Sequence, residues 1–306
     1  MIENYVVARD FEEAFNVIEL NPEKTRVIAG GTDSYLQLSK AKRASVILDI
    51  TGIEELSIIR CSDDFIEIGA AVTLTEARET PWLKDEAPSL IEAIQEVASL
   101  QIRNQGTVVG NILTGRAAGG VRVCAVTFEA TLVIRGPEGE RELAIGGMPG
   151  SDSFKLQRDE IVTSLRIPRR QETRISSYLC SKPRKGFAYP SVSVAVSLAI
   201  DDQKFEKVRM AVSPILPSAS RAGMKPCETC GGTCKICKVR RLPELEQELE
   251  GSSVAKDSIA EACEAYDWEL LPIRDSLVNG SAELRRQVIK TLSRRALVKT
   301  VERYSK

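Results

Sequence analysis

Residues 101–120, QIRNQGTVVGNILTGRAAGG, limit the possible folds of this chain more than any other stretch. They contain five glycines and no acidic side chain. Glycine allows positive φ and lets another group approach the main chain closely. A loop with many backbone N–H groups and no carboxylate is a suitable lining for a phosphate. The stretch therefore predicts an anion-binding loop, with ordinary glycine turns as the alternative.

A second turn of this kind lies in residues 27–38, VIAGGTDSYLQL, where a short apolar run meets Gly30 and Gly31. A strand that runs into a helix here would direct the N–H groups of Gly30, Gly31 and Thr32 at a pyrophosphate. Asp33 is either a helix N-cap or a ligand contact. Neither turn has the Rossmann GxGxxG pattern, so together they predict a dinucleotide held by another fold.

Composition excludes several classes of protein. The chain has 306 residues, 43% of them hydrophobic and 28% charged, with a net charge of −1. This length predicts two or three domains, and the charge predicts neither a nucleic-acid partner nor a membrane partner. No run approaches the roughly 18 apolar residues of a membrane span, and the N-terminus has no secretion signal, so we expect a cytoplasmic protein.

The chain has no histidine. This excludes serine–histidine and cysteine–histidine catalysis, histidine general bases and zinc sites with imidazole ligands. Such a composition is typical of an enzyme in which a cofactor carries the chemistry.

Four of the eight cysteines lie close together as C-x2-C-x3-C-x2-C: Cys227, Cys230, Cys234 and Cys237. Four thiolates at this spacing can bind either a [4Fe–4S] cluster or zinc. Tight spacing and the surrounding lysines and arginines favour the iron–sulfur cluster, and a cytoplasmic location argues against disulfides. The other four cysteines are scattered, and we expect them to be buried core residues: Cys61, Cys124, Cys180 and Cys263.

Hydrophobic patterning predicts an α+β fold. Alternating strand and helix patterns in the first fifty residues predict a small α/β subdomain. Antiparallel hairpins are predicted at 57–72 and 128–145, and three strand-like runs follow from about residue 174. Two helices are predicted in more detail. Ser89 and Glu92 form a capping box at the start of one, and the closing helix buries the stripe Leu284, Val288, Leu292 and Ala296.

The segments AGGTD and QIRNQGTVVGNI resemble the two flavin-binding signatures of the FAD subunit of molybdenum hydroxylases. This family includes the medium chains of xanthine dehydrogenase and carbon monoxide dehydrogenase, with the PCMH-type FAD-binding fold. The resemblance continues in order along nearly the whole chain, through residues 48–56, 66–77, 159–168, 184–200 and 272–297. The cysteine-rich segment is absent from the common family pattern and resembles an insertion.

The resemblance implies a domain order. FAD-binding subdomain 1 covers residues 1–55, FAD-binding subdomain 2, which is antiparallel, covers 56–170, and a C-terminal domain covers 171–306. The C-terminal domain would contain a three-stranded antiparallel sheet, helices and the cysteine-rich insertion at about 222–241. The residues implied to contact the cofactor are Ala29, Gly30, Gly31, Thr32, Asp33, Thr107, Gly110, Asn111, Arg116, Gly119, Gly120, Val162 and Lys182.

The chain departs from the family pattern within the second signature. Val109 replaces a glycine, Arg116 replaces a serine, and Gly120 stands where the family has an aspartate that binds the FAD ribose. Arg116 either pairs with a phosphate or is a surface arginine. Val162 either packs on the flavin ring or is plain core, and Lys182 either contacts the flavin or is solvated.

The resemblance implies an oxidoreductase subunit without catalytic side chains of its own. Substrate would be oxidised on a separate large subunit that carries molybdopterin, and a small subunit with [2Fe–2S] centres would pass electrons to FAD. The electrons would leave to NAD+, or through the four-cysteine centre to another acceptor. Two alternatives stay open: an FAD-less assembly or electron-wiring subunit, which Val109 and Gly120 favour, and a zinc-stabilised interaction module.

Overall fold

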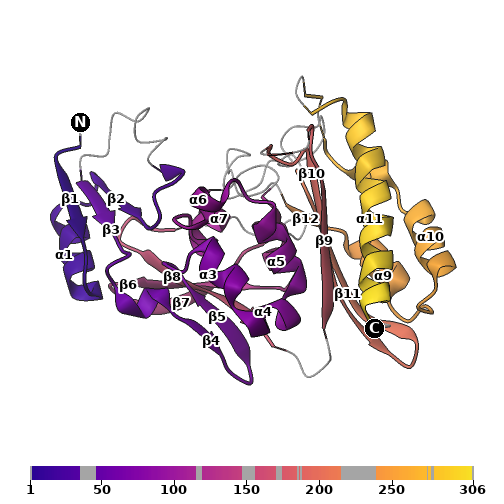
Figure 1. Ribbon diagram of the computed structural model, residues 1–306, viewed down its shortest axis with the longest axis horizontal. Helices are drawn as coiled ribbons and strands as arrows, with labels where there is room; N and C mark the ends of the chain where they lie inside the picture. The colour runs from indigo at the N-terminus through magenta and orange to yellow at the C-terminus, as the bar shows by residue number, and fades with distance from the viewer. Residues whose placement is uncertain are drawn as a thin grey trace.

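The computed structural model describes residues 2–34, 46–114, 119–146, 156–169, 174–184, 186, 188–214, 239–273, 275–276 and 279–304. Three β-sheets follow one another along the length of the molecule (Figure 1). The predicted α+β fold, a small α/β part followed by two antiparallel sheets with helices, is confirmed. Across the described ranges, no helix combines the length and the apolar character needed to cross a membrane.

The first sheet is parallel, with the strand order β1-β3-β2. Its elements are β1 (Asn4–Val7), α1 (Phe11–Leu20), β2 (Thr25–Ile28) and β3 (Val46–Asp49). Asp10 caps α1 by accepting a hydrogen bond from the N–H of Glu13 at 2.8 Å, and Phe11, Ala14 and Ile18 are buried. Strand β2 leads directly to the first glycine turn.

The second sheet is antiparallel, with the order β4-β5-β8-β6-β7. One face is apolar, with Ile68 and Leu165 fully buried, and α7 packs against its strands β5 and β8. The other face carries polar side chains such as Glu67 and Arg166, because residues alternate between faces along a strand. The elements of this part are η1 (Glu54–Ser57), β4 (Ile59–Cys61), β5 (Phe65–Gly69), α3 (Leu74–Glu79), α4 (Pro81–Glu86), α5 (Pro88–Gln95), α6 (Leu100–Arg103), α7 (Val108–Leu113), α8 (Gly120–Thr127), β6 (Thr131–Gly136), β7 (Gly139–Ala144) and β8 (Ile161–Pro168).

The third sheet is antiparallel, with the order β12-β11-β10-β9. The three predicted strands are confirmed, and a two-residue strand, β12, adds to them. Helix α11 packs on β9 and β10, while α5 and α8 contact the same strands, so the sheet joins the two halves of the molecule. Its elements are β9 (Ile175–Ser181), β10 (Val192–Asp201), β11 (Lys204–Ser213), β12 (Arg240–Arg241), α9 (Pro243–Leu249), α10 (Lys256–Ala265), η3 (Trp268–Leu270) and α11 (Ala282–Tyr304).

The capping box predicted at Ser89 and Glu92 is wrong. Helix α5 begins at Pro88, and Ser89 is buried inside it. Proline suits the first helical position because it has no N–H to satisfy. The Glu92 carboxylate instead accepts hydrogen bonds from the N–H of Tyr178 at 2.8 Å and from Arg303 at 2.6 Å. Glu92 therefore joins α5 to β9 and α11.

The stripe predicted for α11 is confirmed at Ala296, which is buried, while Val288 and Leu292 are half-buried against the core. It is wrong for Leu284, which is 55% exposed, and it omits Ile289, Leu297 and Thr300, which the helix buries. The error has a polar cause, because the hydroxyls of Thr300 and Ser177 lie 2.6 Å apart at the contact with β9. A face that contains such buried hydroxyls cannot be found from apolar spacing alone.

Candidate FAD-binding site

The two glycine turns predicted from the sequence lie against each other. A methyl group at Gly30 would overlap the carbonyl oxygen of Gln105, and one at Gly106 would lie 3.2 Å from Oγ1 of Thr32. Glycine is required at residue 30 because the two main chains approach too closely for a side chain. The turn after β2 and the turn after α6 therefore form one continuous backbone surface.

The first turn changes chain direction at Gly31, where φ is +66°. A residue with a β-carbon is strained in this left-handed region. Ala29, Thr32 and Asp33 flank Gly31, and all three are half-buried. The turn thus presents short side chains and main-chain groups beside Gln105, as expected for contact with a dinucleotide.

The second turn contains two short helices, where the sequence predicted a loop. Ser99 caps α6 by accepting a hydrogen bond from the N–H of Ile102 at 3.3 Å. Thr107 caps α7 in the same way, with its Oγ1 3.0 Å from the N–H of Gly110. Thr107 is buried and its hydroxyl oxygen serves the helix, while contact of Thr107 with FAD stays a prediction.

Arg103 holds the start of this turn. Its Nη1 donates to the carbonyl oxygens of Val97 at 2.7 Å and Ala98 at 3.0 Å. Ala98 has a φ of 42°, which is uncommon for a residue other than glycine. The Nη1 atom of Arg103 therefore serves these two main-chain carbonyls, and Arg103 contacts the second glycine turn through the backbone.

The side chain of Asn111 fits contact with a ligand. Its Oδ1 atom is buried and has no hydrogen-bond partner among the described residues. Leaving such an acceptor unsatisfied costs about 1–3 kcal/mol. An N–H or O–H group of a bound molecule would remove this cost. Asn111 lies on α7, one turn after the cap at Thr107, so the orphan acceptor belongs to the second glycine turn.

Gly119 and Gly120 begin α8 beside a buried tyrosine that the sequence analysis missed. A methyl group at Gly120 would lie 2.5 Å from the hydroxyl oxygen of Tyr178. That hydroxyl lies 2.8 Å from Oγ of Ser193, and burial raises the pKa of Tyr178 well above its usual value. The space beside residue 120, where the resemblance implies an aspartate, is therefore occupied by Tyr178. No sequence pattern marks this long-range contact.

The two remaining described candidates lie away from the glycine turns in sequence. Val162 is 5% exposed in β8, pairs with Ile134 and belongs to the apolar core. Lys182 follows β9, and its ammonium group forms an ion pair with Glu96 at the end of α5. A flavin contact for Val162 and Lys182 stays a prediction.

Arg116 and the four clustered cysteines, Cys227, Cys230, Cys234 and Cys237, lie outside the described residues. The described part of the chain contains no group of three or more residues arranged to hold a metal ion. The two strands that flank the cysteine-rich segment pair with each other, with Val212 opposite Arg240. The described strands on either side of the segment therefore lie next to each other at one edge of the third sheet.

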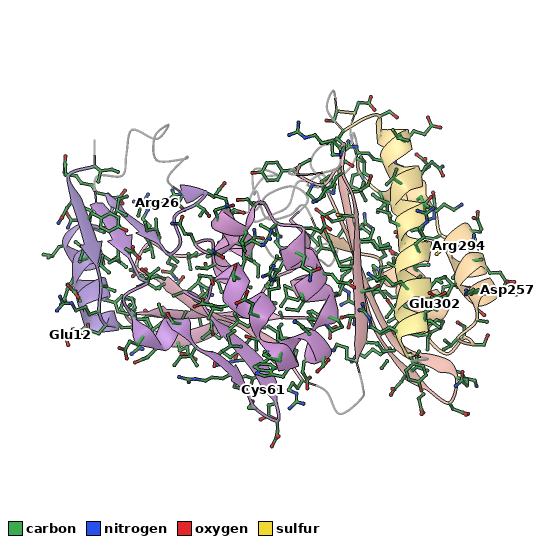
Figure 2. All side chains as sticks on the ribbon, viewed as in Figure 1. Glu12, Arg26, Cys61, Asp257, Arg294 and Glu302 are labelled. Atoms are coloured by element: carbon green, nitrogen blue, oxygen red, sulfur yellow. The ribbon has the colours of Figure 1, made fainter. Side chains whose placement is uncertain are left out.

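The scattered cysteines differ in burial. Cys124 and Cys263 are buried as predicted, and burial raises the pKa of the Cys124 thiol. Cys180 is half-buried. The prediction of burial is wrong for Cys61, which is exposed at the end of β4, an edge strand in a projecting hairpin (Figure 2). Short edge strands have neighbours on one side only, so apolar residues there stay accessible.

Comparison with known proteins gives a consistent result. A family model described as the FAD binding domain in molybdopterin dehydrogenase matches residues 1–170. The nicotinate dehydrogenase FAD-subunit of Eubacterium barkeri is 31% identical over 58% of this chain and 61% of its own length. The nicotine 6-hydroxylase medium subunit of Paenarthrobacter nicotinovorans is 27% identical over 96% of this chain and 95% of its own. A solved structure of carbon monoxide dehydrogenase from Hydrogenophaga pseudoflava, which lacks the Mo-pyranopterin moiety of its cofactor, has the same fold. Its TM-score is 0.82, with 22% identity over 99% of this chain and 98% of that one.

Proposed function

The chain belongs to the family of FAD-binding domains in molybdopterin dehydrogenases, and we propose that it is the electron-transfer flavoprotein subunit of a multi-subunit molybdenum hydroxylase. The observation that carries this proposal is the contact between the two glycine turns, at Gly30 and Gln105. Both turns lie in the part of the chain that the family model matches. The subunit is an oxidoreductase component, and substrate oxidation belongs to another chain.

The residues around the two turns fit FAD. Main-chain groups of Gly30, Gly31 and Thr32 suit its pyrophosphate, and the buried Oδ1 of Asn111 needs the donor that a ligand supplies. FAD provides hydride and single-electron chemistry when bound, so this chain needs no catalytic acid or base. Without histidine, the chain holds the flavin noncovalently unless another residue type attaches it.

The proposed partners are a large subunit that carries molybdopterin and a small subunit with [2Fe–2S] centres. The names of the relatives support an assembly of this kind, since the Eubacterium barkeri protein is called an FAD-subunit and the Paenarthrobacter nicotinovorans protein a medium subunit. The four described cysteines are free thiols, and this also favours a cytoplasmic location. The subunit would accept electrons from the small subunit and deliver them to NAD+ or to another acceptor.

We propose that electrons reach an acceptor other than NAD+ through a [4Fe–4S] cluster at Cys227, Cys230, Cys234 and Cys237. Its support is the spacing of the four cysteines, together with the firm attachment of the strand that follows them. Arg241 in β12 pairs with the buried carboxylate of Glu246, and Met210 donates its N–H to the same group at 2.8 Å. A fixed base for the segment suits a centre that must stay at a constant distance from its electron donor.

An anaerobic ultraviolet–visible spectrum, with iron and zinc counted on the same sample, tests the proposal. Flavin bands with a broad bleachable shoulder and about four irons per chain are expected. Substitution of Cys227 and Cys230 by serine should remove the iron and leave the flavin, while Cys263→Ser should leave both. Gly30→Ala should remove the flavin. One zinc per chain together with flavin would show that the four cysteines bind a structural zinc ion and not an iron–sulfur cluster. A colourless protein that does not bind added FAD would refute the main proposal.

A further inference from the structure

Tyr178 contacts the start of α8, although it lies outside the part of the chain that the family model matches. That match ends at residue 170, and Tyr178 follows in β9, on the third sheet. Helix α8 begins at Gly120, which the resemblance implies as a cofactor contact. Its eight residues are buried, and no described side chain caps its first turn. The backbone at this end of the glycine-rich stretch 101–120 therefore depends on contacts from outside the helix.

The end of the Tyr178 ring fills the space that a side chain at residue 120 would need. A methyl group at Gly120 would lie 2.5 Å from the hydroxyl oxygen and 2.6 Å from Cζ of Tyr178. Non-bonded heavy atoms normally stay about 3.5–4.0 Å apart, so the ring and any side chain at residue 120 exclude each other. The main chain at Gly120 thus packs directly on the phenol group, and a change in the position of this group would move it.

Tyr178 is fixed on the third sheet. Its hydroxyl oxygen lies 2.8 Å from Oγ of Ser193 in β10, and its N–H donates to the carboxylate of Glu92 at 2.8 Å. Tyr178 is 3% exposed. It lies opposite Ala195, and Ala195 lies opposite Ala211, so small side chains leave room for α8 along this row of the sheet. Both the main chain and the hydroxyl end of Tyr178 are therefore anchored within the protein itself.

Gly120 is connected with the rest of the candidate site through α7. Helix α7 packs against α8, and it carries Asn111, whose buried Oδ1 has no hydrogen-bond partner among the described residues. Closely packed interiors transmit small displacements from one element to the next. A shift of the first turn of α8 would therefore also move the backbone that carries this acceptor.

We propose that Tyr178 is a positioning residue of the FAD site, supplied by the third sheet. Its hydroxyl group, held by Ser193, sets the position of the Gly120 backbone and so keeps the end of the glycine-rich stretch in the conformation that binds FAD. The inference rests on the proposed function, because it requires FAD to bind at the two glycine turns. It extends that function to the part of the chain after residue 170, which therefore takes part in cofactor binding.

FAD titration by flavin fluorescence, with urea unfolding of the same proteins without FAD, tests this role. Tyr178→Phe keeps the ring and removes only the hydroxyl, and it should weaken FAD binding by about three- to tenfold. Ser193→Ala should weaken it by a similar factor. Because both substitutions break one hydrogen bond, the double variant should bind FAD about as weakly as the weaker single variant. At saturating FAD, the visible circular dichroism of the flavin should change in Tyr178→Phe, which a simple loss of stability would not produce.

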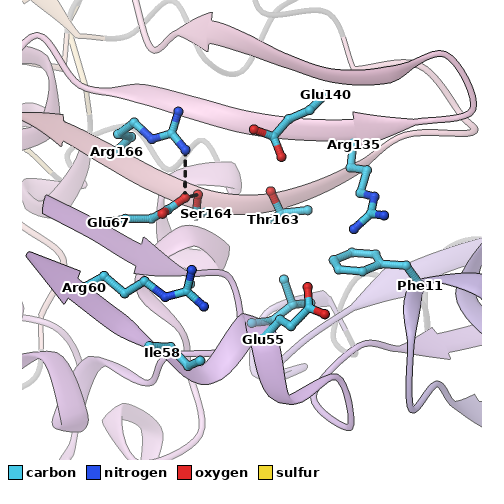
Figure 3. A pocket seen from close by; sticks show the side chains of 12 residues that line it. Phe11, Glu55, Ile58, Arg60, Glu67, Arg135, Glu140, Thr163, Ser164 and Arg166 are labelled. Atoms are coloured by element: carbon cyan, nitrogen blue, oxygen red, sulfur yellow. Dashed lines mark hydrogen bonds and ion pairs between the residues drawn. The ribbon is translucent and has the colours of Figure 1, made fainter. Parts of the chain in front are cut away.

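Two control variants remove buried hydroxyl groups elsewhere in the protein. Tyr266→Phe removes a hydroxyl that has no hydrogen-bond partner in the described part of the chain. Ser164→Ala removes one that donates to Glu67 at 2.6 Å on the polar face of the second sheet (Figure 3). Both controls should bind FAD as the wild type does, with an unchanged flavin spectrum. A loss of affinity in the controls equal to that in Tyr178→Phe would overturn the positioning role.

A steric exchange between residues 120 and 178 gives an independent test. Gly120→Ala should weaken FAD binding at least about tenfold in the wild type, where the new methyl group meets the ring. The same change should weaken it less than about twofold in a Tyr178→Leu background, where the end of the ring is absent. Equal effects in both backgrounds, or normal affinity of both Tyr178→Phe and Ser193→Ala, would overturn the role of Tyr178 and leave the FAD proposal intact. A wild-type chain that binds no FAD would instead overturn the proposed function, and this inference with it.

Discussion

Removing the Arg103 guanidinium should loosen the second glycine turn and weaken FAD binding. Arg103 donates to the carbonyl oxygens of Val97 at 2.7 Å and Ala98 at 3.0 Å, and these bonds hold Ala98 at a φ of 42°. The turn leads into α6, whose Ile102 carbonyl accepts the N–H of Gly106 at 2.7 Å. A shift at Ala98 therefore reaches the backbone that packs against Gly30.

The size of the effect follows from these contacts. A hydrogen bond to a charged group contributes about 1.5–3 kcal/mol, and the two bonds share one guanidinium, so Arg103→Ala should lose about 2–4 kcal/mol of stability. If FAD binding has to restore the ordered turn at about half of this free energy, about 1–2 kcal/mol, FAD affinity falls by about 5–30-fold. Arg103→Lys has one flexible ammonium in place of the planar fork and should recover only part of the loss.

Replacing Ala98 by glycine separates local strain from a general loss of folding. The left-handed conformation costs an alanine about 1–2 kcal/mol, and the greater unfolded-state freedom of glycine offsets about 0.5–1 kcal/mol of the gain. Ala98→Gly should therefore raise FAD affinity in the Arg103→Ala background by about two- to fivefold and change it little in the wild type. FAD titration by flavin fluorescence measures all four proteins. Equal effects of Ala98→Gly in both backgrounds, or normal affinity of Arg103→Ala, would refute the reasoning.

Three further predictions concern single contacts. Gly120→Asp should lose about 1–3 kcal/mol in urea unfolding because the new side chain collides with Tyr178, and a stable variant with tighter FAD binding would contradict this. Burial raises the pKa of Glu92, but hydrogen bonds from Lys299, Tyr178 and Arg303 lower it overall. The ionised Glu92 carboxylate therefore contributes its full stability above the pKa of about 4.3 that it has in the unfolded chain. This contribution disappears as the pH falls through the lower pKa that Glu92 has in the folded protein. Glu92→Gln should cost about 1.5–3 kcal/mol at pH 7, and this cost should shrink as the pH falls below the unfolded pKa of about 4.3, measured by guanidinium unfolding; a cost that does not change with pH would exclude a charge effect. In thiol titration, exposed Cys61 should react at once and Cys124 only after unfolding, because Cys124 is buried and burial raises its pKa. One more fast-reacting thiol in the wild type than in Cys124→Ser would contradict this.

Local patterns in the sequence predicted much of the fold. Period-two alternation in residues 57–72 and 128–145 identified both hairpins of the second sheet, and the apolar runs before Gly30 and after Ala44 identified β2 and β3. These signals are local because each strand buries one face and its turn residues lie beside it. The parallel strand β1 was missed, since its four residues are mostly exposed and carry no alternation in burial.

The sequence identified the residues of the two glycine turns but not the contacts between them. Glycines mark both turns, yet nothing in their sequence shows that Gly30 meets the carbonyl of Gln105. Arg103 bonds to main-chain carbonyls, which every residue has, so its partners have no sequence signature. The contact of Gly120 with Tyr178 depends on how α8 packs on the third sheet. Non-local packing decides all three contacts, and patterning along one strand or helix does not report it.

Helix α8 connects the two regions to which we assign redox groups. Its first residue, Gly120, packs on Tyr178 at the proposed FAD site. Just after its last residue, Glu129 pairs with Arg209 at 2.7 Å and with Arg241 at 3.3 Å. Arg241 lies in the strand that follows the cysteine-rich segment, and all eight residues of α8 are buried. A buried helix with fixed contacts at both ends has little freedom to move. Helix α8 therefore joins Gly120 to the strand that follows the cysteine-rich segment, and these two parts of the chain are held in one packed unit.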